Sequence, residues 1–339
     1  MLVEIRSYKK PTIHDNSQIV LAGDIGATKT NLALFKAQGN TIVSLAEKEF
    51  QSKEYKNITE VTEIFLRETP VPDTACFGVA GPVINGRAKL SNILWDIEST
   101  QLARHFKIKK VVLLNDLEAN AYGLAMLTKK DVTSIQTAKN ASQGNIALIS
   151  PGTGLGEAGL YWDGRYYHPF ATEGGHCDFA PRDEFDFELY NFLKKKFGHV
   201  SWERLICGPG ILNIYNFLKL KKKRKEPEWL MKKMKVGDAA AIISQYVGKS
   251  AICNETMEHF IRYLACESAN LVLKFKATGG LFIGGGIAPK IISLFNNNHF
   301  NDSFCQSGRL NYLLEKVTIK IIVNTQTALL GAAWYGFNN

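Results

Sequence analysis

Residues 20–35 read VLAGDIGATKTNLALF, and residues 146–161 follow the same pattern as IALISPGTGLGEAGLY. In each stretch a run of apolar residues meets a short turn of glycine and threonine and then resumes. An apolar run on either side of a tight glycine turn predicts two strands joined by that turn. Superposing the two stretches places Gly26 on Gly152 and Leu34 on Leu160, which hints at an internal duplication.

Strand-like and helix-like patterns alternate along the rest of the chain. Strands are predicted at residues 18–23, 31–35, 75–80 and 111–114, a strand with a glycine turn at 280–286, and helices at 59–68, 117–127, 185–196 and from 327. This alternation is typical of an α/β fold. Because 339 residues exceed one ordinary core, the sequence predicts two domains, with a junction near Thr128.

The overall composition, with 45% hydrophobic and 22% charged residues, is that of a soluble globular protein. No run of about 18 apolar residues is present, and residues 1–17 lack the apolar segment of a secretion signal. The six cysteines are scattered without a Cys-x-x-Cys pair, which is typical of reduced thiols. We therefore expect a cytoplasmic protein with no membrane partner.

The chain carries 41 Lys and Arg residues against 32 Asp and Glu residues, a net charge of +9. Much of the excess lies in a basic segment, residues 219–235. Such a run is usually a solvated face. Nucleic acid is not expected as a partner, because the interleaved aromatic residues of a base-stacking motif are absent around the segment. We assign no role to it.

The turn at residues 24–30 can hold a phosphate. Glycine lets backbone N–H groups come close to phosphate oxygens, and threonine hydroxyls can add to them. Asp24 at the strand end can hold Mg²⁺ through water, because this ion prefers few carboxylates together with substrate phosphates. The turn lacks the G-x-x-x-x-G-K-[ST] spacing, and a plain hairpin with a capping aspartate is the alternative. The candidate phosphate-binding residues are Gly26, Ala27, Thr28, Lys29 and Thr30.

The turn at residues 150–156 is a second candidate for phosphate, through Gly152, Thr153 and Gly154. One glycine turn is a weak signal, but two of them behind similar strands can grip a polyphosphate from both sides. A third glycine run follows a strand at residues 281–289 and lets a flat ring such as adenine lie against backbone. An ordinary core turn is the alternative for its glycines, which are Gly284, Gly285 and Gly286.

Asn115 and Asp116 stand between a predicted buried strand and a predicted helix. The carboxyl end of a strand is where α/β folds place their sites. There Asp116 can accept the proton of an attacking hydroxyl while Asn115 orients a sugar. Both residue types also favour the N-cap of a helix, and that alternative stays open.

Glu173, His176 and Glu203 are candidates for binding a sugar ring, whose paired hydroxyls need several convergent hydrogen-bonding groups. They lie in EGGHCDFAP at residues 173–181 and in GHVSWER at residues 198–204. A zinc site is the alternative for His176. Because Cys177 is the only cysteine beside it, no zinc site is expected.

Together these motifs resemble the bacterial glucokinase family, within the superfamily of actin-like and hexokinase-like ATPases. The resemblance runs from about residue 21 to residue 331. LAGDIGATKT and PGTGLG look like the two phosphate motifs, LLNDLEANAYG like the connecting motif, and LFIGGGIAP like the adenosine motif. EGGHxDFAP together with GHVSxER is the most specific part of the resemblance.

The resemblance implies a two-domain α/β fold of the actin-like or hexokinase-like (ribonuclease H-like) ATPase type, with an active-site cleft. The small α/β domain would comprise residues 1–127 and 325–339, and the large α/β domain residues 128–324. The implied activity is ATP-dependent phosphorylation of glucose to glucose 6-phosphate, the first step of glycolysis, with Mg²⁺ as the metal. Members of the family are typically homodimers.

Carried over position by position, the resemblance implies that Asp116 is the general base. The implied sugar contacts are Asn115, Glu173, His176 and Glu203, and the implied phosphate contacts are Gly26, Thr28, Gly152, Thr153 and Gly154. This chain has Ala27 where the family usually has a second glycine, which adds a methyl group beside the phosphates. The zinc-binding cysteine cluster of the related repressor–kinase family is absent after His176, which favours the metal-free branch.

Three alternatives stay open. A kinase for another hexose, such as mannose or glucosamine, is possible because epimers differ only in the direction of one hydroxyl. A sugar-responsive regulator on the same scaffold would need a DNA-binding module, and the roughly 17 residues before the first strand are too few for one. An actin-like or chaperone-like ATPase without a small substrate would leave Glu173, His176 and Glu203 unexplained.

Overall fold

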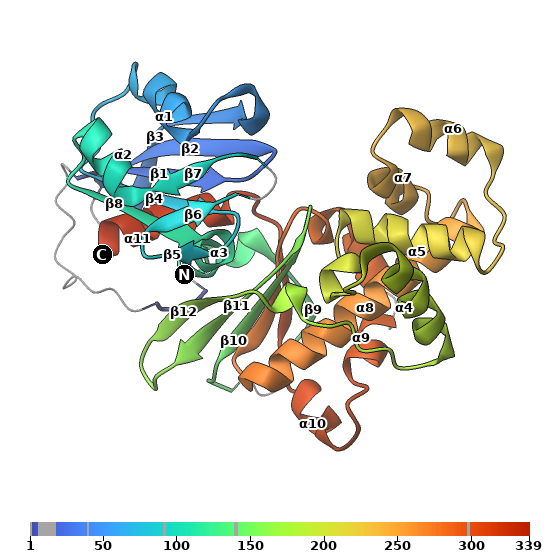
Figure 1. Cartoon of the computed structure of the whole chain (residues 1–339). Helices are drawn as coiled ribbons and strands as arrows, with labels where there is room; N and C mark the ends of the chain where they lie inside the picture. The colour runs from blue at the N-terminus through green and yellow to red at the C-terminus, as the bar shows by residue number, and fades with distance from the viewer. Residues whose placement is uncertain (1, 6–17, 39–40, 91–92, 139–141, 297–298) are drawn as a thin grey trace. The chain divides into compact units, whose positions relative to one another are not determined.

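The computed structural model describes residues 2–5, 18–38, 41–90, 93–138, 142–296 and 299–339 (Figure 1). Contacts within the chain divide it into two compact units. The first unit comprises Met1–Asp131, Leu160–Ala171 and Asn324–Asn339, and the second comprises Val132–Gly159 and Thr172–Val323. Among the described residues, no helix is both long enough and apolar enough to cross a membrane.

The early strands and the C-terminal helix make up most of the first unit. Its elements are β1 (Ile19–Ile25), β2 (Lys29–Gln38), β3 (Thr41–Gln51), η1 (Ser52–Glu54), α1 (Ile58–Leu66), β4 (Thr74–Val79), β5 (Val83–Ile84), β6 (Arg87–Lys89), β7 (Asp96–Glu98), α2 (Ser99–Phe106), β8 (Lys110–Asn115), α3 (Asp116–Gly123), η2 (Lys129–Asp131) and α11 (Thr327–Asn338).

The remaining elements run from residue 132 to residue 322, and parts of β11 and β12 are counted with the first unit. They are β9 (Val132–Gln136), β10 (Ile146–Pro151), β11 (Leu155–Trp162), β12 (Tyr167–Thr172), η3 (Gly174–His176), α4 (Glu184–Phe197), η4 (Trp202–Arg204), α5 (Gly208–Leu220), α6 (Glu228–Val236), α7 (Ala239–Gln245), α8 (Ala251–Phe275), β13 (Gly280–Ile283), η5 (Ala288–Asn296), α9 (His299–Phe304), η6 (Gly308–Leu310), α10 (Asn311–Leu314) and β14 (Ile319–Ile322).

The two large sheets repeat one strand order. One sheet runs β3-β2-β1-β4-β8, and the other runs β12-β11-β10-β13-β14-β9, so that in both a chain of three successive strands is followed by two later ones. The later strands are parallel to the innermost early strand: β4 pairs with β1 and β8 with β4, just as β13 pairs with β10 and β14 with β13. The predicted duplication is therefore confirmed at the level of sheet topology, with β9 as an additional edge strand.

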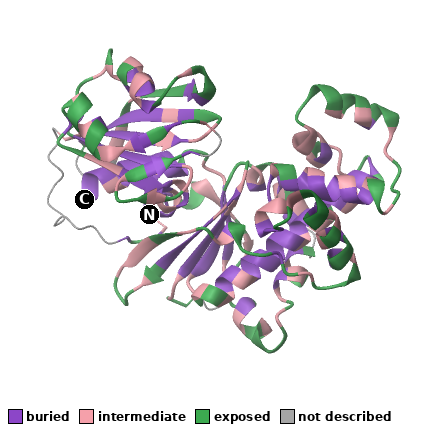
Figure 2. Ribbon diagram, in the orientation of Figure 1, coloured by how far each residue is buried: buried purple, intermediate pink, exposed green. Residues whose placement is uncertain are grey.

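One core cluster of the first unit lies between its five-stranded sheet and the helices α1 and α2. The sheet also packs against the pair α3 and α11. Every residue of β4 is buried, as expected for a strand with parallel neighbours on both sides (Figure 2). Helices α3 and α11 approach closely because each has a glycine at the contact. A Cβ atom built on Gly331 would lie 1.8 Å from the carbonyl oxygen of Ala119, and one on Gly123 would lie 2.1 Å from that of Thr327.

The helix predicted at residues 117–127 is shorter in the structure, where α3 ends at Gly123. The N–H groups of Leu124, Ala125 and Met126 donate to carbonyls three residues back, at 3.3, 3.2 and 2.9 Å, so the chain leaves the helix through tighter turns. The other predicted strands and helices agree with observed elements to within a few residues.

The core of the second unit is built around α8, a helix of 25 residues. Fifteen of its residues are buried, because it packs against α5 on one side and against α9 and β10 on others (Figure 2). The helix ends where Lys276 takes a left-handed conformation, with φ at 48°, and its N–H donates back to the carbonyl of Leu273 at 3.2 Å. The chain then enters β13 directly.

Candidate active site

The predicted site residues of the first unit lie at one edge of its sheet. In the parallel register Ile25 is opposite Val79 and Val79 is opposite Asn115, so the carboxyl ends of β1, β4 and β8 finish in line. Neighbouring strands are about 4.8 Å apart, which places the end of β1 about 10 Å from Asn115. The turn at residues 24–30 and the Asn115–Asp116 pair therefore share this edge, as the sequence predicted for a site at strand ends.

The turn at residues 24–30 is held from behind by Ser52. The N–H of Gly26 donates to the carbonyl of Lys29 at 2.9 Å, and the Ser52 hydroxyl donates to the carbonyl of Gly26 at 2.7 Å. The hydroxyls of Ser52 and Thr30 share a hydrogen bond of 2.9 Å, in which Thr30 must be the donor because Ser52 has already used its proton. Thr30 is fully buried and supports the turn, whereas Thr28 is exposed on its outer side.

Two other residues of this turn have clear surroundings. Lys29 is exposed and pairs with Glu49 at 2.8 Å. Ala27 is not among the described residues with positive φ, so its backbone takes a conformation that any L-residue can adopt. The methyl group of Ala27 therefore brings no backbone strain to a turn that in the resembling family usually carries glycine.

Asn115 is the N-cap of α3. Its Oδ1 accepts from the N–H groups of Leu117 at 2.9 Å and Glu118 at 3.3 Å, and its Nδ2 donates to the carbonyl of Gly81 at 3.0 Å. An amide carries two N–H donors, so Asn115 can still donate one bond to a ligand. Asn115 is thus the N-cap, and Asp116 follows it as the first residue of the helix.

Asp116 is the first residue of α3 and is partly exposed. One carboxylate oxygen, Oδ1, accepts from the N–H of Leu117 at 2.9 Å. The first turn of a helix favours negative charge, because the unpaired N–H groups there carry a partial positive charge. The position therefore supports an ionised carboxylate in contact with solvent.

Asp24 lies at the end of β1, opposite Asn31 in the β1–β2 hairpin. Burial of its carboxyl raises the pKa of Asp24 to about 6. Mg²⁺ accepts a single protein carboxylate, direct or through water, when substrate phosphates complete its shell. Asp24 could therefore supply the one carboxylate that a magnesium–nucleotide complex would need from this chain.

In the second unit, three glycine segments converge at the carboxyl ends of β10 and β13. The N–H of Gly208, at the start of α5, donates to the carbonyl of Gly152 at 2.9 Å. A Cβ atom built on Gly152 would lie 4.0 Å from the backbone nitrogen of Gly286, and one on Gly285 would lie 2.3 Å from the carbonyl oxygen of Pro151. The second phosphate turn, the glycine run after β13 and the N-terminus of α5 thus form one backbone-lined surface.

The N-terminus of α5 strengthens this surface electrically. The helix has 13 residues, and its first N–H groups carry partial positive charge that favours an anion. Its N-cap is Cys207, whose Sγ accepts from the N–H of Gly210 at 3.3 Å. Burial raises the pKa of the Cys207 thiol to about 12, so the cap stays protonated and uncharged.

The two predicted sugar segments lie side by side in the second unit. Asp178 and Ser201 form an antiparallel bridge, and the N–H of Trp202 donates to the carbonyl of Cys177 at 3.1 Å. This pairing holds η3, with Glu173 just before it and His176 at its end, against η4, which contains Glu203. Glu173 and His176 are exposed, so their side chains are available to a ligand.

Glu203 joins the sugar segments to the second phosphate turn. Its Oε2 accepts from the N–H of Leu155 at 3.1 Å. A Cβ atom built on Gly154 would lie 2.5 Å from the same oxygen, so Gly154 must remain a glycine for the carboxylate to sit there. The structure therefore brings together Gly152, Thr153, Gly154 and Glu203 within one short piece of backbone.

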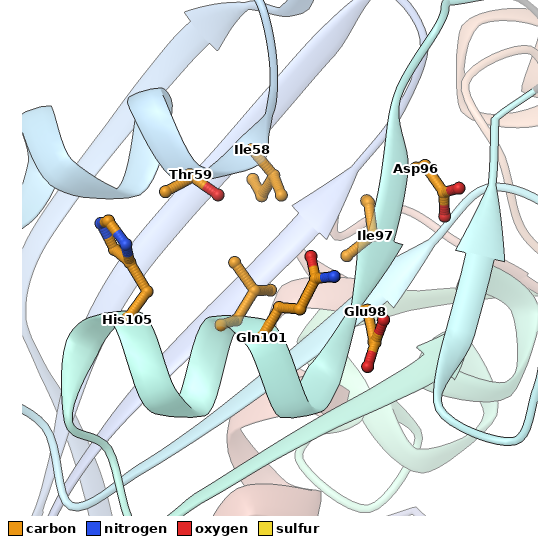
Figure 3. Close-up of a pocket in the computed structure, with 8 residues that line it drawn as sticks. Ile58, Thr59, Asp96, Ile97, Glu98, Gln101 and His105 are labelled. Carbon is orange, nitrogen blue, oxygen red and sulfur yellow. The ribbon is translucent and has the colours of Figure 1, made fainter.

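Two hollows in the first unit were not predicted from the sequence. One, of about 140 Å³, lies between α1, β7 and α2 and is lined by polar and apolar side chains including Thr59, Gln101 and His105 (Figure 3). It is smaller than the roughly 300 Å³ at which small-molecule sites begin. The other, of about 620 Å³, includes Pro82, next to the Gly81 that Asn115 contacts, and is lined further by Arg87 and Lys89.

Within the described part of the chain no three His, Cys, Asp or Glu side chains gather in a way that could hold a metal ion. His199, in the segment at residues 198–204, pairs with an acid. Its Nε2 lies 2.9 Å from Oδ1 of Asp178. His176 has a backbone bond instead, its N–H donating to the carbonyl of Glu173 at 3.0 Å.

A family model described as Glucokinase matches residues 21–338. A glucokinase of Trichormus variabilis is 37% identical over 334 residues, covering 93% of this chain and 98% of the relative. The chain belongs to the glucokinase family. The fold agrees with this membership, since the crystal structure of a glucokinase from an Antarctic psychrotroph has a TM-score of 0.80 and 29% identity and covers 95% of this chain and 99% of that one.

More distant glucokinases share the fold alone. A ROK family glucokinase from Streptomyces griseus, solved in complex with glucose and AMPPNP, has a TM-score of 0.63 at 18% identity, covering 93% of this chain and 98% of that one. These likenesses establish for this glucokinase-family chain the actin-like ATPase fold that the motifs predicted.

Two residues at the site of this glucokinase-family chain were not singled out from the sequence. Ser52 is far from the phosphate turn along the chain, and no local pattern points to it. Glu157 is a charged residue in the apolar run LGEAGLYW of β11, and it is 1% exposed. That contrast between a carboxylate and an apolar strand was the available signal, since strand interiors rarely bury an unpaired acid.

Proposed function

We propose that this glucokinase-family enzyme transfers the γ-phosphate of ATP to the primary hydroxyl of glucose with Asp116 as general base. Asp116 would accept the hydroxyl proton as the new O–P bond forms and the bond to the leaving ADP breaks. The transition state of phosphoryl transfer is loose, so the base mainly orients the nucleophile and does not need an unusual pKa. It stands in the first turn of α3, where the helix N–H groups carry a partial positive charge that favours an acidic side chain.

The proposed sugar ligands are Glu173, His176 and Glu203, together with the remaining amide donor of Asn115. Carboxylates suit this role because they accept from two sugar hydroxyls at once. The observation that carries the proposal is the placement of Glu203, which contacts the N–H of Leu155 beside the phosphate turn while belonging to a sugar segment. The sugar and the phosphate would then bind to neighbouring residues, because Glu203 contacts the backbone next to the phosphate turn.

The polyphosphate would lie along Gly26, Ala27 and Thr28, with Lys29 at the turn's surface and Thr30 bracing it from below. In the second unit Gly152, Thr153 and Gly154 would serve the same purpose, with the N-terminus of α5 beside them. The adenosine would rest on Gly284, Gly285 and Gly286. Mg²⁺, held by the nucleotide and by Asp24 through water, would neutralise charge on the leaving phosphate.

We also propose that the protein acts in the cytoplasm as a homodimer, at the first step of glycolysis. The six cysteines support the compartment, because all are free thiols and several are buried where oxidation could not easily reach them. The homodimer rests on the family resemblance alone. Sedimentation at micromolar concentration tests it, and a particle of the monomer's 37.8 kDa would contradict it.

The activity is tested by measuring ADP release from ATP with glucose, mannose, glucosamine and no sugar in parallel. We expect the fastest turnover with glucose and a rate without sugar that is lower by at least about a hundredfold, since a kinase must keep water from the γ-phosphate. Equal rates with and without sugar would contradict the proposal. A preference for mannose or glucosamine would leave the proposed phosphoryl transfer in place and replace glucose as the substrate.

Asp24 should give the enzyme an acidic limit in its use of magnesium–ATP. The pKa of Asp24 is raised to about 6, so its carboxylate is lost as the pH falls through that value. With Mg²⁺ in excess we expect kcat/KM for ATP to fall about tenfold per pH unit below that point, as for one essential ionised group. Asp24→Asn should be slower at pH 7.5, and its kcat/KM for ATP should not show this fall at acidic pH. If the fall persists in Asp24→Asn, it comes from titration of the nucleotide.

A further inference from the structure

Glu157 is a buried acid for which the structure provides no hydrogen-bonding partner. It lies in β11, two residues after Leu155, and both of its carboxyl oxygens are inaccessible to solvent and without a partner among the described residues. Burying such a group without a partner destabilises a protein. The residues around Glu157 indicate what it can do there.

The carboxyl of Glu157 presses against the turn that carries the proposed sugar ligands. A Cβ atom built on Gly174 would lie 1.9 Å from Oε2 of Glu157, so the acid fills the space that any larger residue at position 174 would need. The Thr172 hydroxyl ties the same two segments together: it donates to the carbonyl of Glu157 at 3.0 Å and accepts from the N–H of Gly174 at 3.2 Å. The Glu157 carboxyl thus packs against the turn at residues 173–176, where it contacts Gly174.

The charges around Glu157 do not balance if it is ionised. On its other side stands α8, where the fully buried Glu267 pairs with Lys274 at 3.1 Å and accepts from Asn270 at 2.7 Å. Lys274 is therefore already committed to one carboxylate. Burial, and then the charge of Glu267, raise the pKa of Glu157 to about 8, with Lys274 acting in the opposite direction. Cys177, at the end of the neighbouring turn, lies close enough to Lys274 to interact with its charge.

We propose that Glu157 is a positioning residue for the sugar, which as an uncharged acid holds the turn at residues 173–176 in its binding geometry and which releases that turn when it loses its proton. This rests on the proposed function, in which Glu173 and His176 contact glucose. An ionised carboxylate in this place would need water or a new donor, and the turn that Gly174 lets approach so closely stands directly against it. Glucose affinity would then decline at alkaline pH.

The pKa of Glu157 is higher in the folded protein than in the unfolded chain, and this direction determines how stability depends on pH. The folded protein holds the Glu157 proton more tightly than the unfolded chain, whose value is near 4.5. The stability that this group contributes is therefore fully present below about pH 4.5 and is lost as the pH rises through about 8. Glucose binds the protonated form, so above that pH binding must be accompanied by proton uptake.

The test compares Glu157→Gln with the unaltered enzyme between pH 7 and pH 9, following KM for glucose and kcat separately. Gln keeps the shape and the neutral state and cannot ionise. In the unaltered enzyme we expect KM for glucose to rise about tenfold over this range, as for one ionisation near 8, with kcat much less affected. In Glu157→Gln the KM should match at pH 7 within about twofold and stay flat to pH 9. Glu184→Gln, an exposed change in α4, should keep the rise.

An alkaline rise that persists unchanged in Glu157→Gln would overturn the inference, as would a decline confined to kcat. If the variant does not fold, calorimetry of glucose binding to the unaltered enzyme at pH 8.5 in two buffers of different ionisation enthalpy decides. We expect uptake of most of one proton per glucose, and no uptake would overturn the inference. Failure of the proposed site is distinct, because Glu173→Gln would then leave KM for glucose unchanged even at pH 7.

Discussion

Asp116→Asn is expected to lower kcat for glucose phosphorylation by at least about a hundredfold while leaving the fold intact. A neutral amide cannot take the hydroxyl proton, and general-base contributions are about 10²–10⁴-fold, or roughly 3–5 kcal/mol of barrier. The structure sharpens this expectation, because Asn115 and not Asp116 supplies the N-cap of α3. The substitution leaves the N-cap in place, and the amide oxygen of asparagine can still accept from the N–H of Leu117, so the melting temperature should stay within a few degrees.

The matched control is Asp96→Asn, also an aspartate of the first unit. Its carboxylate is exposed and makes only a long ion pair with Lys89, at 3.7 Å, so kcat should be retained. If Asp116→Asn keeps most of its kcat, Asp116 is not the base and another carboxylate must be sought at the ends of β1, β4 and β8. If both variants lose activity together, the loss reports folding, and the melting curves will register it.

Glu173→Gln is expected to raise the KM for glucose about tenfold or more and to leave the KM for ATP nearly unchanged. The substitution preserves shape and removes the negative charge that strengthens bonds to sugar hydroxyls, each worth about 1.5–3 kcal/mol. Glu173 is exposed at the start of η3, so nothing in the core depends on its charge. The measurement is a pair of saturation curves, one for each substrate, at pH 7.

The control for this variant is again Glu184→Gln, in the first turn of α4 in the same unit, which should leave both KM values unchanged. A collapse of ATP binding in Glu173→Gln with sugar binding preserved would reassign the turn at residues 173–176 to the nucleotide. That result would also remove the basis for the role of Glu157, whereas a normal Glu173→Gln phenotype leaves that role to be tested by its pH profile.

The sequence by itself determined the parts of this protein whose cause is local. The glycine turns after β1 and β10 are readable because a tight turn between apolar runs needs small residues at those positions. Their similarity hinted at an internal duplication, and Asn115 and Asp116 were placed at a strand end because the apolar run before them stops there. Glu173, His176 and Glu203 were chosen because carboxylates and an imidazole near glycines suit sugar hydroxyls, and the family resemblance implied the same three contacts.

The tertiary structure alone decided how these residues divide their tasks. Asn115 caps α3 and Thr30 is buried against Ser52, although the sequence left capping open between Asn115 and Asp116 and listed Thr30 among the candidate phosphate-binding residues of its turn. The apolar run around Glu157 offered a local signal, but its contact with Gly174 and its interaction with Glu267 are known only from the fold. Burial, charge balance and the use of each donor depend on residues brought together from distant parts of the chain, and no local pattern encodes them.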